Sequence, residues 1–250
     1  MNKIKKILKP NLWCIHGNLQ LPSVWSDLEE NFSDQFNIHK VNLWKSNGKS
    51  LWEWSKLFCR EVTVQSKCED NFLLGYSLGG RLALHSLISK PNIWKKAVII
   101  GTDTGYGNQK ERYRQLVFDK SWSDRFLVEP WDELLKNWNS QSVFCGYDNK
   151  FVCKEKDFDR KTISRFFNIF SKGRQEDLIT FLSGIINKPI LYISGEKDKK
   201  YSEIGENLET NYKNIKHAII QHAGHRVPWE NPEAFMDELK KFIIGPVYTQ

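Results

Sequence analysis

The chain offers few of the features that mark membrane, secreted or metal-binding proteins. No apolar stretch in it approaches the ~20 residues that a membrane-spanning helix needs. The N-terminus, MNKIKKILKP, is basic but has no apolar run long enough for a signal peptide. The cysteines are odd in number and scattered, without a CxxC pair: Cys14, Cys59, Cys68, Cys145 and Cys153. This pattern indicates neither a zinc site nor a disulfide framework, and a cytoplasmic setting is expected by default.

Cofactor and nucleic-acid motifs are also missing. The chain contains no Walker loop and no dinucleotide-binding G-x-G-x-x-G, so no cofactor is expected. Its net charge is +7, but the basic residues are spread along the chain, and the one tight cluster lies at the N-terminus (Lys3, Lys5, Lys6 and Lys9). Neither nucleic acid nor a membrane is therefore expected as a partner. A small anionic substrate suits the overall positive field, and the oligomeric state stays open.

The apolar residues that are present predict a single domain with one sizeable core. Hydrophobic residues make up 40% of the 250-residue chain. Six short apolar runs are predicted to be buried strands, because most of them are nearly continuous. These runs are Leu12–Ile15, Phe36–Leu43, Asn71–Gly75, Ala97–Gly101, Pro189–Ser194 and His217–Gln221.

Helical patterns alternate with these runs, which predicts a doubly wound, mostly parallel α/β sheet. The expected helices are Val24–Phe32, Leu51–Val64, Leu78–Ser89, Glu203–Leu208 and Pro232–Ile243. The alternation breaks between about Gly105 and Gly173, where several short helical patterns occur without a convincing strand. We therefore expect a core built from residues 1–104 and 174–250, and a helical cap inserted at 105–173.

The strongest functional signal is the segment Gly75-Tyr76-Ser77-Leu78-Gly79-Gly80. It matches G-x-S-x-G between a predicted strand and a predicted helix, the context of the nucleophile elbow in the α/β-hydrolase fold. The turn is tight, so neighbours with side chains would clash. This predicts that Ser77 presents its hydroxyl at the carboxyl edge of the sheet, with the N–H of Leu78 at the positive end of a helix.

A serine nucleophile needs a base, and in this fold the chain order is serine, acid, histidine. Asp198 follows the run Pro189–Ser194, and His225 follows His217–Gln221 in a glycine-containing loop. Both positions lie at the carboxyl ends of strands, where open α/β sheets form their sites. We therefore predict Ser77, Asp198 and His225 as the catalytic triad.

Other residues compete for these roles. Glu196 could replace Asp198, and Asp103 follows an earlier strand at a position that some relatives of the fold use for the acid. His222 lies three residues before His225, but a metal-binding pair would lack further ligands, so no metal is expected. His16 is expected to be a structural, hydrogen-bonding histidine.

Stabilising an anion on the substrate requires fixed donors. One is the N–H of Leu78, and the other should come from the loop after the first strand. That loop reads Cys14-Ile15-His16-Gly17-Asn18-Leu19. Because Gly17 allows close backbone approach, the N–H of Asn18 is the predicted second donor of the oxyanion hole.

Several segments resemble the MenH family, the SHCHC synthases of menaquinone and phylloquinone biosynthesis. The elbow is followed directly by Arg81, as in that family. The family's cap pattern is matched by Glu111-Arg112, Trp122, Trp138 and Val143-Phe144, and its acid and histidine segments by Gly195–Lys200 and Ala223–His225. The resemblance spans most of the chain from Leu12 to Phe242.

This resemblance implies a lyase that removes pyruvate from 2-succinyl-5-enolpyruvyl-6-hydroxy-3-cyclohexene-1-carboxylate, with the triad acting as a proton-abstracting base. The substrate carries three carboxylates and so demands several cations, preferably Arg. Arg81 lies one helical turn after Ser77. The expected substrate-binding residues are Tyr76, Arg81, Arg112, Arg114, Trp138 and Arg165.

The chain also departs from the family pattern. Asn42–Ser50 stands where the family has Asp-Leu-Pro-Gly-His-Gly-x-Ser, and Gln115 occupies the place of a second cap arginine. Thr102–Gly105 replaces a small-residue Pro-Gly turn, and Asn18 an aromatic residue. Two alternatives therefore stay open beside the lyase: an ester, thioester or C–C bond hydrolase with Ser77 as nucleophile, and a catalytically silent binding protein.

Overall fold

A six-stranded parallel sheet organises the part of the chain that the computed structural model describes, residues 8–66, 70–144 and 147–245. Its strand order is β2-β1-β3-β4-β5-β6. The strands are β1 (Asn11–Ile15), β2 (Asn37–Val41), β3 (Asn71–Tyr76), β4 (Trp94–Ile100), β5 (Ile190–Gly195) and β6 (Ile215–Ile220). Each corresponds to one of the six predicted runs, so the doubly wound parallel sheet is confirmed.

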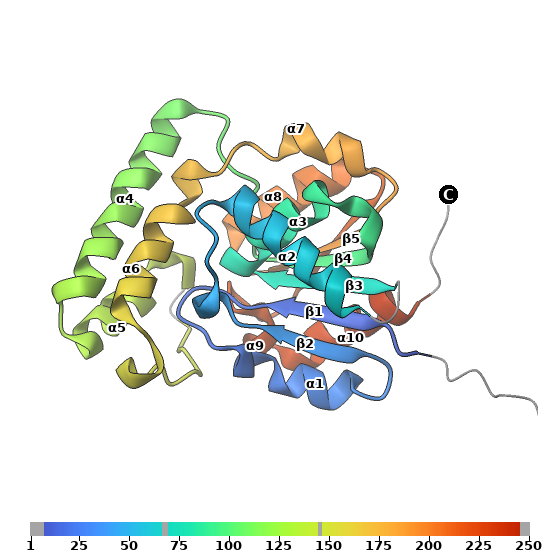
Figure 1. Ribbon diagram of the computed structural model, residues 1–250, viewed down its shortest axis with the longest axis horizontal. Helices are drawn as coiled ribbons and strands as arrows, with labels where there is room; N and C mark the ends of the chain where they lie inside the picture. The colour runs from blue at the N-terminus through green and yellow to red at the C-terminus, as the bar shows by residue number, and fades with distance from the viewer. Residues whose placement is uncertain (1–7, 67–69, 145–146, 246–250) are drawn as a thin grey trace, which may run out of the picture.

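Helices cover both faces of this sheet (Figure 1). One face carries α2 (Leu51–Gln65), α3 (Leu78–Ser89) and α8 (Lys199–Asn211), and the other carries α1 (Ser26–Phe32), α9 (Val227–Glu230) and α10 (Pro232–Ile244). The short α7 (Ile179–Leu182) precedes β5. The start of α10 is as predicted, because Pro232 is in its first turn and the Asn231 side chain accepts from the N–H of Ala234.

Alternate residues of each central strand supply the two cores. In β1, Trp13 and Ile15 pack beneath α2 and α3, whereas Leu12 and Cys14 pack beneath α1 and α10. Both faces of the strand are therefore buried, which explains why the central strands read as continuous apolar runs. The edge strand β2 is only half-buried, and its sequence is correspondingly more polar.

A separate layer of helices lies between β4 and β5 in the sequence, at the end of the sheet toward which the strands run (Figure 1). It contains α4 (Gln109–Val128), α5 (Trp131–Asn139) and α6 (Arg160–Ile169). Its hydrophobic core is made of Trp122, Phe126, Trp131, Leu134, Ile163 and Phe167, and Leu19 from the loop after β1 packs into the same cluster. The predicted boundaries 105 and 173 enclose these helices and stay a prediction.

The length of the longest of these helices, α4, was underestimated from the sequence. Its polar composition suggested only short helical patterns, yet α4 runs for 20 residues. The buried positions Asp119, Trp122, Ser123 and Phe126 form a single stripe against α6, and the remaining faces are largely exposed. Packing along this narrow stripe stabilises a helix that overall hydropathy does not reveal. Within the described residues, no helix is both long and apolar enough to cross a bilayer.

Gly79 provides a test of how tightly α3 is pressed against the sheet. A Cβ atom at this position would lie 2.3 Å from the carbonyl oxygen of Ile15 and 2.5 Å from that of His16. Because backbone atoms cannot give way, we expect Gly79→Ala to lower the free energy of unfolding by about 1–3 kcal/mol or more. Urea unfolding measures this difference.

The matched control is Gly184→Ala, because a Cβ atom there would meet nothing within 4 Å. We expect this control to stay within about 0.5 kcal/mol of the parent chain. Equal unfolding midpoints for Gly79→Ala and the parent would contradict the tight contact between α3 and β1.

Candidate active site

The strand–turn–helix at Ser77 has the strained geometry that its sequence predicts. Ser77 lies between β3 and α3 with φ 52° and ψ −112°, a conformation that a residue with a side chain rarely adopts. Neighbouring glycines allow the turn: a Cβ atom at Gly75 would lie 2.5 Å from the carbonyl oxygen of Gly79, and one at Gly80 would lie 1.8 Å from the Thr102 hydroxyl. The turn therefore holds the Ser77 hydroxyl above the carboxyl edge of the sheet.

The fold brings Ser77 together with the predicted acid and base. His225 Nε2 lies 3.3 Å from Ser77 Oγ, and His225 Nδ1 lies 2.6 Å from Asp198 Oδ2. Asp198 follows β5 and His225 follows β6, and both side chains are buried. The charged acceptor at Nδ1 favours the tautomer that leaves Nε2 free to accept the serine proton.

The competing acids have other partners. Glu196 Oε2 accepts from the backbone N–H of His222, and Asp103 Oδ2 accepts from Lys200 Nζ at 2.6 Å. His222 has a φ of 57° and occupies the turn that precedes His225. No group of three metal-ligating side chains occurs within the described ranges. Asp198 is thus the carboxylate that reaches the imidazole of His225.

His16 stabilises the loop that carries Asn18. Its Nδ1–H donates to the Gly17 carbonyl oxygen at 2.8 Å, and its Nε2 accepts the Leu43 N–H at 3.2 Å. The Gly17 N–H donates to Gln20 Oε1 at 2.9 Å, which closes the turn. Asn18 lines the same small cavity as Ser77. The roles of the Asn18 and Leu78 N–H groups as oxyanion donors stay predictions.

The cavity at Ser77 lies between the core and the helical layer and has a volume of about 30 Å³. Its lining residues are Asn18, Leu19, Gln20, Tyr76, Ser77, Trp138, Phe144, Asn149 and Arg226. Tyr76 and Trp138 are therefore where the sequence placed them, at the wall of the site. A larger cavity of about 530 Å³ lies between β2 and α2, but none of the triad residues lines it. The smaller cavity is therefore the candidate active site, because Ser77 lines it.

None of the four predicted substrate-binding arginines lines the cavity at Ser77. Arg81 is buried and its Nη1 donates to the Phe170 carbonyl oxygen at 2.7 Å. Arg112 donates to the carbonyl oxygen of Gly173, and Arg165 to that of Ser46. Arg114 is exposed on α4. Their contact with a substrate stays a prediction.

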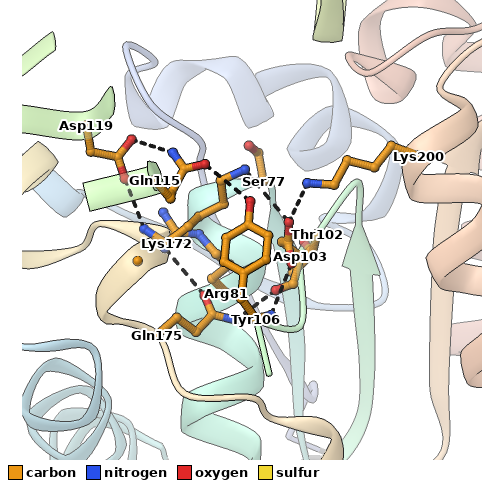
Figure 2. Close-up of polar contacts among 12 residues, drawn as sticks. Ser77, Arg81, Thr102, Asp103, Tyr106, Gln115, Asp119, Lys172, Gln175 and Lys200 are labelled. Carbon is orange, nitrogen blue, oxygen red and sulfur yellow. Dashed lines mark hydrogen bonds and ion pairs between the residues drawn. The ribbon is translucent and has the colours of Figure 1, made fainter. Parts of the chain in front are cut away.

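Arg81 belongs to a buried polar cluster one helical turn beyond Ser77 (Figure 2). Gln175 connects it to the core, because its Oε1 accepts from Arg81 Nη1 at 3.4 Å and its Nε2 donates to the Asp103 carbonyl oxygen at 2.9 Å. Asp119 of α4 accepts from the Lys172 N–H at 3.1 Å. The cluster thus joins α4 and the segment after α6 to the loop that follows β4.

Charges within this cluster shift one another's pKa values. Burial alone would raise the pKa of Asp103, but Lys172, Lys200 and the Gly105 N–H outweigh burial and hold that pKa below its usual value. Burial and the nearby Lys200 lower the pKa of Lys172 to about 8. The loop after β4 is therefore held by an ionised carboxylate between two lysine side chains.

Arg226 is the charged cavity residue that the sequence interpretation overlooked. It follows His225 directly, and its side chain is buried in the wall of the Ser77 cavity. Its place in the sequence could have identified it. His225 was predicted to follow a strand at the carboxyl edge of the sheet, so the next residue must also lie near the site. The arginines predicted from the sequence all lie directly after the elbow or in the cap, and none lies in this loop.

Comparison with known proteins agrees with this geometry, although no family model matches the chain. A 2-succinyl-6-hydroxy-2,4-cyclohexadiene-1-carboxylate synthase of Serratia proteamaculans is 28% identical over 183 residues, 71% of this chain and 69% of its own length. The synthase of the same name from Pectobacterium atrosepticum is 26% identical over 96% of both chains. The structure of MenH from S. aureus superposes with a TM-score of 0.84 at 17% identity, covering 96% of this chain and 95% of its own.

The parallel sheet, the elbow and these similarities define an enzyme of the α/β-hydrolase fold. Among such enzymes the chain is MenH-like, since its curated relatives carry the name of the MenH reaction and its backbone follows that of MenH from S. aureus. The sequence prediction of both the fold and the resemblance is confirmed.

The buried imidazole of His16 leads to a prediction about acid stability. Burial lowers its pKa from the usual 6.5 to about 4, so between these values the unfolded chain binds a proton that the folded chain does not. Stability must therefore fall as the pH falls through this window. From pH 7 to pH 5, His16 contributes a loss of about 2 kcal/mol, measurable by urea unfolding.

The variant His16→Gln removes this titration, so its unfolding free energy should depend less steeply on pH between 7 and 5. His85, whose pKa burial also lowers to about 4, titrates in the same window and stays in both chains. Its contribution cancels in the comparison. Identical slopes for the two chains would show that His16 is free to bind a proton in the folded state.

Proposed function

We propose that the protein is a 2-succinyl-6-hydroxy-2,4-cyclohexadiene-1-carboxylate synthase, which eliminates pyruvate from an enolpyruvyl tricarboxylate by base catalysis. The observation that carries this proposal is the alignment of Ser77, His225 and Asp198 in a chain whose curated relatives bear that name. The small cavity beside Ser77 and its buried guanidinium suit an anionic substrate.

In the proposed reaction Ser77 acts as a base rather than as a nucleophile. His225 Nε2 accepts the hydroxyl proton, and the Ser77 oxygen removes a proton from a ring carbon of the substrate. The electron pair of that C–H bond moves into the ring, and the C–O bond to the enolpyruvyl unit breaks. The departing enolate takes the proton from His225 and tautomerises to pyruvate, which returns the enzyme to its starting state.

The backbone around Ser77 supports such a proton abstraction. Leu78 is the first residue of α3, so its N–H lies at the positive end of a helix dipole. The loop that carries Asn18 is held rigidly by the hydrogen bonds of His16 and Gln20. Fixed donors stabilise a developing negative charge without reorganising, and one such donor is typically worth about 2.7–4 kcal/mol.

The cap must move for a substrate of this size to enter. A cavity of about 30 Å³ holds little more than ordered water, whereas the tricarboxylate is many times larger. The cap closes the cavity through Trp138, Phe144 and Asn149. Cap opening brings in the substrate, and closure then excludes water from the reacting carbanion.

The predicted arginines would complete the site during this motion. Arg81 is buried one helical turn after Ser77, and its partners are a carbonyl oxygen and the Gln175 amide. Both partners are neutral, and both lie in the segment that follows α6. A displacement of this segment would free the Arg81 guanidinium for a substrate carboxylate, which it binds more strongly than a neutral acceptor.

Pyruvate release tests the proposed reaction. We expect the purified protein to release pyruvate from 2-succinyl-5-enolpyruvyl-6-hydroxy-3-cyclohexene-1-carboxylate, measured by coupling to lactate dehydrogenase. Ser77→Ala should lower the rate about 10³-fold or more, because the proton-abstracting oxygen is removed. Ser89→Ala, at the far end of the helix that Ser77 precedes, is the matched control, since the Ser89 hydroxyl is buried without a hydrogen-bond partner and lies outside the site. Pyruvate release at the background rate by the parent chain would refute the proposal.

A serine hydrolase is the second candidate, because a Ser77 hydroxyl 3.3 Å from the imidazole could equally attack a carbonyl carbon. Activated esters distinguish the two functions. A hydrolase should show burst kinetics and a covalent adduct on Ser77, detected by mass spectrometry after a fluorophosphonate. The proposed lyase should release pyruvate without accumulating any adduct.

A further inference from the structure

Arg226 differs from the other arginines near the site because its side chain lines the cavity at Ser77. It precedes the short helix α9 and follows His225 directly, so its backbone is tied to the triad. Its side chain is 5% exposed, and its guanidinium carbon lies 3.7 Å from the centre of the Phe144 ring. Phe144 also lines the cavity, and it holds the guanidinium plane in place by stacking.

The hydrogen-bond partners of Arg226 are neutral. Its Nη2 donates to Asn139 Oδ1 at 2.6 Å, and its Nη1 donates at 3.4 Å to the carbonyl oxygen of Tyr147. Across the described ranges no carboxylate lies within ion-pair distance of it. A buried cation normally has a carboxylate partner, because neutral acceptors compensate poorly for lost water.

The charge of Glu230 acts on Arg226 and opposes the effect of burial on its pKa, but no ion pair joins the two side chains in the described ranges. Glu230 lies one turn further along α9, and its Oε2 accepts the Gly224 N–H at 2.6 Å. This bond holds the turn before His225, so Glu230 supports the histidine and does not pair with the guanidinium. Burial lowers the pKa of Arg226 from its usual value, but the group stays protonated at neutral pH.

We propose that Arg226 binds a carboxylate of the substrate in the Ser77 cavity, releasing its cap partners Asn139 and Tyr147 as the ligand enters. This inference rests on the proposed function and adds to it the residue that selects for an anion beside the reacting carbon. The exchange is favourable because a guanidinium pairs with a carboxylate through two parallel charge-assisted bonds. It also couples ligand binding to the cap, since Asn139 belongs to α5.

Binding can be measured without turnover. Ser77→Ala protein is titrated with succinate, a small dicarboxylate, and with its uncharged counterpart succinamide, by isothermal calorimetry. In this background Arg226→Gln should weaken succinate binding about tenfold to hundredfold and leave succinamide binding unchanged. Arg226→Lys keeps the charge but loses the planar fork, so its affinity for succinate should be intermediate.

Two further variants separate ligand binding from a structural role. Arg125→Gln is the matched control, because Arg125 also stacks on a cap aromatic, at 4.2 Å from the Trp122 ring, yet lies outside the cavity lining. It should bind succinate like the parent. Asn139→Ala removes a cap partner and keeps the cation, so succinate affinity should be retained or increased. If Asn139→Ala instead weakens binding as much as Arg226→Gln, Arg226 serves only to hold the cap.

The outcomes for the two proposals are distinguishable. Loss of succinate binding in Arg226→Gln without pyruvate release by the parent would retain the anion site and refute the synthase. Pyruvate release with equal Michaelis constants for the parent and Arg226→Gln would retain the synthase and refute the anion site. Failure of the Ser77→Ala protein to bind succinate at millimolar concentration would also count against the anion site.

Discussion

The 2.6 Å contact between His225 Nδ1 and Asp198 Oδ2 is the interaction on which the proposed chemistry depends. It holds the imidazole in the tautomer whose Nε2 faces Ser77, and without it the serine would be an ordinary hydroxyl. The backbone is shaped to allow it. Gly101 has a φ of 51°, and a Cβ atom there would lie 3.0 Å from the imidazole, so the end of β4 can approach the ring closely only without a side chain.

The boundary between the cap and the core has two parts that differ in how their charged side chains are paired. On one side, the buried carboxylate of Asp103 pairs with the partly exposed Lys172 and Lys200 and ties the cap to the loop after β4. On the other side, Arg226 lines the cavity at Ser77, and its hydrogen-bond partners are neutral. A bound anion would gain little electrostatic stabilisation from the first cluster, because a carboxylate is already present there. The charge distribution thus favours the cavity at Ser77 as the place for a substrate carboxylate.

Prediction from sequence matched the structure where a local pattern fixes the geometry. The elbow needs glycines at fixed spacing around Ser77. The predicted acid and base each follow a strand, and the alternation of strand and helix patterns along the chain already identifies these strands. It was less successful in the cap, where α4 is polar over most of its surface and its 20-residue length was not expected. Arg112 and Arg114 were expected ligands because the resemblance implies a substrate with three carboxylates, yet Arg112 donates to Gly173 and Arg114 is exposed.

The sequence by itself determined the order of the strands along the chain, the strained serine turn and the two segments that bring Asp198 and His225 to the carboxyl edge of the sheet, because each of these depends on a pattern among neighbouring residues. Only the tertiary structure decided which cation reaches the cavity. A helix offers its side chains on every side, and which of them faces the site depends on how the cap packs through its own aromatic core. That packing turned the cap arginines away and left Arg226, anchored in the loop of His225, at the wall of the cavity.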